Sequence, residues 1–237
     1  MTDVLELSLP RPTIESPRED KKNYAERFSR AGATWIANGL RSRFKGITPD
    51  EYGSEQERRI GSARGPKKLD VAYSTSALGL ALGVSVKSIN FRDPKTQRYT
   101  KNYSRNDNEL RAEALDYHTR QPFAVLVGVL FMPEGCYYDS KMTKKGATAS
   151  SFQAAVPYFR QRTGRRDTKN DHALFERFFL GIFSEQTGGM RFFDVMEPPP
   201  PHHPPLPDEG LKFEELLREI AKAYDERNSP PKARPAQ

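Results

Sequence analysis

Cysteine is almost absent from this sequence of 237 residues. Cys136 is the single one, which excludes an internal disulfide bond and any zinc site built from cysteines. Long apolar runs are missing too, because no stretch reaches the roughly 18 residues needed to span a membrane. The opening MTDVLELSLPRP contains acids and prolines where a signal peptide would be apolar. We therefore expect a cytoplasmic protein with no membrane partner.

The charge balance of the chain is basic. Lysine and arginine number 38 against 31 aspartates and glutamates, which gives a formal net charge of +7. Such a balance favours polyanionic partners, chiefly nucleic acid, although solubility alone would also account for it. Apolar residues make up 36% of the sequence, which suffices for a core because they gather in a few segments.

Composition divides the chain into four parts. We expect an extended arm at 1–20, a folded domain at 21–197, a proline-rich linker at 198–210, and an amphipathic helix with a disordered tail at 211–237. The proline-rich linker should insulate the folded domain from that helix. Residues 134–147 read as a polar loop that carries Lys141, Lys144 and Lys145.

Periodicity predicts the elements of the folded domain. Helical spacing and capping residues predict helices over 21–44, 54–60, 106–119 and 150–162. Alternating or continuous apolar runs predict strands over 68–74, 80–91, 122–133 and 190–196, while 174–183 begins as a helix and ends as a strand. This order predicts an α/β (α+β) fold with a mixed central β-sheet flanked by helices.

Two of these strands hold the residues with the clearest chemistry. Ser85 and Lys87 are two residues apart and so project from the same face of a strand. If the two strands pair as neighbours, Asp70 lies beside them. A carboxylate can hold a hard divalent cation such as Mg2+. A neighbouring lysine can stabilise the charge that develops on a phosphate, or position the attacking water.

This arrangement resembles the PD-(D/E)XK nuclease superfamily, which includes most type II restriction endonucleases. That family places an aspartate at the end of one strand and (D/E)-x-K on the next, and Asp70 and Lys87 match its first and last members. The sequence departs from the pattern twice, because Leu69 replaces the proline and Ser85 stands at the second acidic position. The order of elements over residues 21–196 is also similar. The resemblance implies a restriction-endonuclease-like core and cleavage of DNA with Mg2+, for which Mn2+ would substitute.

Because Ser85 is neutral, the second carboxylate of the pattern must come from another residue. In some restriction enzymes of this superfamily a serine occupies the middle acidic position, and the carboxylate comes from the helix after the lysine strand. Glu109 and Glu113 lie where such a replacement would arise, four residues apart on one flank of the helix predicted at 106–119. We expect Asp70 to hold the metal with a second carboxylate from Glu109 or Glu57, and Glu113 is the alternative on the helix.

Family members also often carry a glutamate upstream of the aspartate. Glu57 is the candidate here, with Glu55 as the second choice. Glu57 equally fits a helix cap, because it follows Ser54 by three residues.

Two basic segments flank this candidate site, one before Asp70 and one after Lys87. Cations neutralise phosphates, and tyrosines can stack on bases or bond phosphate oxygens. The alternative is that these segments are merely solvated. The residues expected to contact nucleic acid are Arg58, Arg59, Arg64, Lys67, Arg98, Tyr99, Lys101, Tyr103 and Arg105.

The resemblance therefore predicts a metal-dependent DNA endonuclease, used in restriction or phage defence. Its expected catalytic residues are Asp70, Ser85, Lys87, Glu109 and Glu57. Because many members act as dimers, the resemblance also implies a homodimer or a larger defence complex. Three alternatives stay open: a protein of the same fold that binds nucleic acid without cutting it, an RNA nuclease, and an interaction module that uses its last helix to bind a partner.

Overall fold

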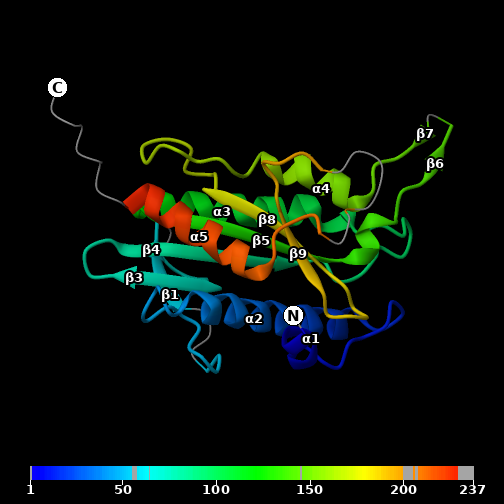
Figure 1. Cartoon of the computed structure of the whole chain (residues 1–237), viewed down its shortest axis with the longest axis horizontal. Coiled ribbons are helices and arrows are strands. Elements are labelled where there is room, and N and C mark those ends of the chain that lie inside the picture. The colour runs from blue at the N-terminus through cyan, green and yellow to red at the C-terminus, as the bar shows by residue number, and fades with distance from the viewer. Residues whose placement is uncertain are drawn as a thin grey trace.

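A mixed five-stranded sheet forms the centre of the molecule (Figure 1). The computed structural model describes residues 2–54, 58–63, 65–144, 146–199, 205 and 208–228. The sheet has the strand order β3-β4-β5-β8-β9. Strands β4, β5 and β8 run parallel, and β3 and β9 lie antiparallel at the two edges. The bounds are β3 Val71–Thr75, β4 Gly79–Ser88, β5 Val125–Pro133, β8 Arg177–Phe183 and β9 Met190–Asp194.

Helices cover both faces of this sheet and create two hydrophobic cores. On one face lie α2 (Arg18–Leu40) and α5 (Phe213–Asn228), whose apolar side chains pack with Val84, Val127 and Phe183. On the other face lie α3 (Tyr103–Arg120) and α4 (Ser151–Arg160), which pack with Leu126 and Leu130. The sequence-based prediction of a mixed sheet flanked by helices is therefore confirmed.

Strand β5 is buried along its whole length. Its residues alternate between the two cores, with Val127 and Val129 in one and Leu126 and Leu130 in the other. An almost continuous apolar run is what a central parallel strand needs, because helices cover both of its sides. This strand is confirmed as the centre of the sheet.

A small antiparallel pair leads into the sheet. Strand β1 (Arg58–Ser62) pairs with β2 (Gly65–Leu69), and β3 begins at Val71. The single strand predicted at 68–74 is therefore two strands that meet at Asp70. Leu69 crosses over Gly83, where an added Cβ would lie only 2.5 Å from the leucine side chain. Gly83 thus permits Leu69 to pack closely against β4, and Gly79, whose φ is +70°, follows the turn between β3 and β4.

Several other predicted boundaries are wrong. The arm expected at 1–20 contains α1 (Thr2–Leu7) and the first residues of α2, and α3 begins at Tyr103 instead of 106. The helix expected at 54–60 cannot extend to residue 60, because β1 occupies residues 58–62. The stretch 174–183 has no helical beginning and enters β8 directly.

Within the polar loop expected at 134–147, the chain forms the short η2 helix (Glu134–Tyr137) and a hairpin of β6 (Met142–Thr143) and β7 (Gly146–Ala147). A further short helix, η1 (Thr100–Asn102), precedes α3.

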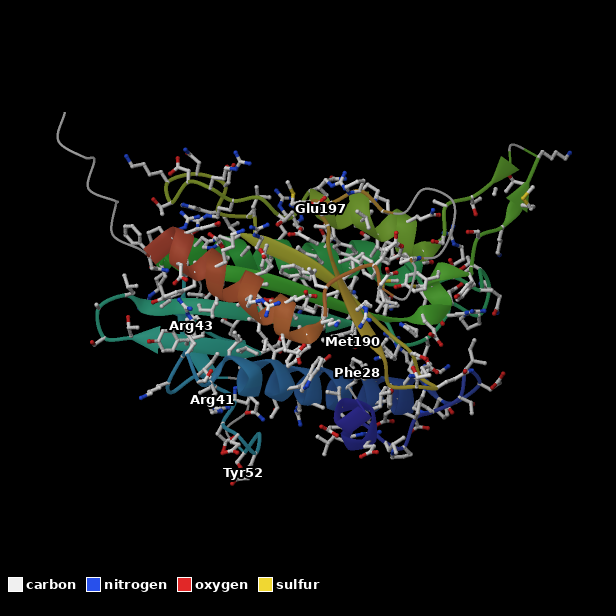
Figure 2. All side chains as sticks on the ribbon, viewed as in Figure 1. Phe28, Arg41, Arg43, Tyr52, Met190 and Glu197 are labelled. Atoms are coloured by element: carbon white, nitrogen blue, oxygen red, sulfur yellow. The ribbon has the colours of Figure 1, made fainter. Side chains whose placement is uncertain are left out.

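Helix α5 is part of the folded domain, which corrects the expected insulation of the C-terminal helix. Leu216 and Ile220 are fully buried in the core shared with α2. The rings of Phe213 and Trp35 stack with their centroids 3.6 Å apart. Arg43, labelled in Figure 2, forms an ion pair with Asp225 at 2.6 Å. Within the described residues, no helix is both long and apolar enough to span a membrane.

Candidate active site

The candidate site lies between β4 and α3. Ser85 and Lys87 are alternate residues of β4 and face α3, whereas Val84 and Val86 point into the opposite core. On α3, Glu109 and Glu113 are four residues apart and therefore share one face of the helix. The two elements thus place a hydroxyl, an amine and two carboxylates against one another.

Ser85 is joined directly to Glu113. The Ser85 hydroxyl donates a hydrogen bond to Glu113 Oε1 at 2.6 Å, and the Ser85 residue is fully buried. Glu113 is 14% exposed at its side chain, whereas Glu109 is 41% exposed. Glu113, the alternative to Glu109, is therefore the helix acid that meets the serine. Glu109 instead accepts a hydrogen bond from Arg105 at 2.8 Å.

Lys87 lies between the two glutamates. Its Nζ is 3.8 Å from Glu113 Oε2 and 3.7 Å from Glu109 Oε2. Burial alone would lower the pKa of Lys87, but the charges of Glu113, Asp70 and Glu109 outweigh it and raise that pKa above its usual value. An amine whose pKa lies above the usual lysine value is a cation at neutral pH.

Asp70 completes the group predicted from the two strands. It lies at the bend between β2 and β3, and its Oδ2 accepts a hydrogen bond from the Val86 amide at 2.7 Å. Val86 is the residue between Ser85 and Lys87, so this bond fixes the carboxylate beside both of them. The structure thus brings Asp70, Ser85 and Lys87 together, as the sequence predicted.

Tyr117 is a site residue that sequence analysis did not identify. It is fully buried, and its hydroxyl has no hydrogen-bond partner among the described residues. Burial raises the pKa of Tyr117, and the nearby charges of Glu113 and Asp70 raise it further, so the phenol stays protonated. The spacing in the sequence could have identified Tyr117, because it follows Glu113 by one helical turn and so lies on the same face of α3.

Asp70 and Glu113 are the two carboxylates of this group that could hold a magnesium ion. Among the residues that the structure describes, no group of three or more His, Cys, Asp and Glu could hold a metal ion. Mg2+ commonly takes only one or two protein carboxylates and keeps several waters. Asp70 and Glu113 supply such a pair of hard oxygen donors. The Tyr117 hydroxyl is an unsatisfied donor beside them, of the kind that a bound water would satisfy.

The two aromatic residues predicted to contact nucleic acid are buried instead. Tyr99 is 7% and Tyr103 is 4% exposed, and both belong to the core under α3 and α4. The Tyr103 hydroxyl donates to the Ser151 carbonyl at 2.7 Å. Stacking on bases is therefore a wrong prediction for both rings, because exposing them would open the core.

The predicted basic contacts divide into two kinds. Arg98 is turned inward and donates to the Ala149 carbonyl at 2.6 Å, so it serves the fold. Lys101 and Arg105 are 66% and 71% exposed at their side chains, and they pair with Asp93 and Glu109. Both remain accessible to a phosphate.

The other predicted residues lie partly or wholly outside the described part of the chain. Arg58 and Arg59 belong to β1 and Lys67 to β2, where the backbone alone is described. Glu57, its alternative Glu55, and Arg64 lie outside the described residues. The β1–β2 pair nevertheless places its basic strands directly before Asp70.

Comparison with known proteins adds no family to this geometry. A scan against protein-family models, a search of curated proteins and a search of solved structures each gave no match.

Proposed function

We propose that this protein is a divalent-metal-dependent nuclease that hydrolyses phosphodiester bonds in DNA. The observation that carries the proposal is the hydrogen bond from Ser85 to Glu113, because it delivers a helix carboxylate to the strand position where the PD-(D/E)XK pattern has an acid. Asp70 and Lys87 occupy the other two positions of that pattern, on the same side of the sheet. The restriction-endonuclease-like core belongs to this proposal.

Asp70 and Glu113 would hold Mg2+. When bound there, the metal would lower the pKa of a coordinated water and neutralise charge on the phosphate. Ser85 orients Glu113 by donating to one of its oxygens, and the Val86 amide does the same for Asp70. Both carboxylates would then already be oriented before metal and substrate bind, so binding would not have to fix their side chains.

Lys87 contributes a fixed positive charge. Its Nζ lies 3.8 Å from Glu113 Oε2, where the ammonium would stabilise the additional negative charge of the pentavalent phosphorus as water attacks. The new bond joins the water oxygen to phosphorus, and the bond to the leaving sugar oxygen breaks. Of the two water protons, one reaches the leaving oxygen and the other is released from the new phosphate.

The substrate class rests on the charge of the chain. The net charge of +7 and the exposed cations Lys101 and Arg105 suit a polyanion. Arg105 pairs with Glu109, which lies beside Lys87, so a phosphate bound by Arg105 would lie at the edge of the site.

The test is nicking of supercoiled plasmid DNA with Mg2+, Mn2+ or EDTA. We expect cleavage with either metal and none with EDTA. Asp70→Asn and Lys87→Ala should each abolish it, while Lys22→Ala, an exposed lysine on α2, should cut like the wild type. Activity that survives in both site variants would exclude this site. DNA binding without cleavage would identify a binding protein of the same fold.

A further inference from the structure

The β6–β7 hairpin stands out from the body of the protein, at the upper right of Figure 1. All four of its strand residues are exposed. It follows η2, which begins where β5 ends. Strand β5 runs parallel to β4, with Lys87 opposite Leu130. Lys87 and the segment that leads to the hairpin therefore both lie toward the carboxyl ends of β4 and β5.

The base of this hairpin is firmly attached. The Lys141 amide donates to Thr148 Oγ1 at 2.9 Å, and the Thr148 amide donates back to the Lys141 carbonyl at 2.8 Å. The next residue, Ala149, accepts the hydrogen bond from Arg98. Arg98 belongs to the loop that follows β4, so this loop is bonded to the residue that follows the base of the hairpin.

The outer part of the hairpin combines exposed cations with an exposed apolar side chain. Lys141 and Lys144 are exposed, and neither forms an ion pair with another described residue. Met142 between them is 81% exposed. Residues 140–148 contain no acid. A cationic ribbon with an uncovered methionine is complementary to a polyanion that also offers apolar contact.

We infer that the β6–β7 hairpin is an arm that enters the major groove of duplex DNA. This inference rests on the proposed function for the identity of the polyanion. The major groove of B-form DNA admits a two-stranded β-ribbon, and its floor presents the methyl groups of thymine. Lys141 and Lys144 neutralise phosphates at the groove walls, and Met142 contacts the floor. A-form RNA has a deep, narrow major groove that excludes the ribbon.

The test is equilibrium binding in EDTA, measured by fluorescence anisotropy on duplex DNA, single-stranded DNA and duplex RNA. For Lys141→Ala/Lys144→Ala, we expect the slope of log affinity against log salt on duplex DNA to become shallower by about 2. Lys22→Ala/Lys222→Ala removes the same charge from exposed helix positions and should give a smaller change. Met142→Ala should weaken duplex DNA binding by about tenfold and leave duplex RNA unaffected. Met196→Ala, also at an exposed methionine, is its control.

The readouts separate this inference from the proposed nuclease. Because binding is scored without metal, a hairpin-dependent affinity supports the arm even if plasmid is never cut. If the protein cuts DNA but the hairpin variants bind like their controls, the arm is excluded and the nuclease stands. Equal losses on duplex DNA and duplex RNA would also overturn the inference, as would a wild-type protein that does not bind duplex DNA. The thermal midpoint should stay unchanged in every hairpin variant, since these side chains are exposed.

Discussion

Ser85 and Glu113 meet across the interface between β4 and α3, with the serine hydroxyl 2.6 Å from the carboxylate. The bond joins β4 to α3, in addition to the ion pairs that Lys87 of β4 forms with Glu109 and Glu113 of α3. Its consequence is that a carboxylate from the helix stands beside Lys87, in a position that the strand itself leaves neutral.

Tyr117→Phe should not destabilise the protein in the absence of metal. The Tyr117 hydroxyl is buried without a described partner, and a buried unsatisfied donor costs about 1–3 kcal/mol. Tyr103→Phe is the matched control, because it removes a hydroxyl that donates to Ser151 and should cost about 1 kcal/mol. Urea unfolding of both variants gives the comparison. A loss in Tyr117→Phe as large as the control would mean that this hydroxyl is satisfied within the protein.

Glu176→Gln should strongly destabilise the fold at neutral pH. Glu176 lies 2.8 Å from the buried Arg165 and 3.0 Å from Arg227 of α5, so the change leaves two cations without their carboxylate. Removing one partner from a buried charge cluster costs about 3–5 kcal/mol. The measurement is the free energy of unfolding in urea at pH 7.

The same variant should lose its effect in acid. Burial alone would raise the pKa of Glu176, but His118, the Leu126 amide and Arg165 outweigh it and lower that pKa below its usual 4.5. A lowered pKa stabilises the fold above about pH 4.5, and this contribution disappears as pH falls through the folded value. The difference between wild type and Glu176→Gln should therefore shrink below pH 4.5. A difference that grows in acid would contradict this assignment.

Leu216→Ala should destabilise the whole domain. Leu216 is fully buried in the core that α5 shares with α2, and such truncations cost about 2–5 kcal/mol. Lys222→Ala on the exposed side of α5 should change stability by less than about 0.5 kcal/mol. Thermal unfolding should show one transition that moves down for Leu216→Ala only. Two independent transitions would mean that α5 is separable from the sheet.

The sequence predicted β4 well because its pattern is local, but it joined β2 and β3, which meet at Asp70, into one strand. Alternation alone places Ser85 and Lys87 on one side of β4, and the continuous apolar run of 122–133 identifies the central strand. The choice between Glu109 and Glu113 depends instead on where α3 crosses β4. Residues four apart share one helix face, so periodicity cannot make that choice.

Tertiary packing explains the other errors. Tyr99 and Tyr103 lie in a basic segment whose composition suits nucleic acid, but η1 and the start of α3 turn both rings into the core. The apolar face of α5 indicated that this helix needs a partner. The proline-rich segment before it does not specify whether that partner is the sheet or another chain.

The most direct test of the proposed site is the Mg2+-dependent rate of plasmid cleavage by Glu113→Gln beside that of Glu109→Gln. The two changes remove the same charge from the same helix, one turn apart. We predict that Glu113→Gln abolishes cleavage as fully as Asp70→Asn, and that Glu109→Gln keeps most of the wild-type rate. A Glu113→Gln protein that cuts at the wild-type rate would contradict the assignment of Glu113 as the carboxylate that completes the site.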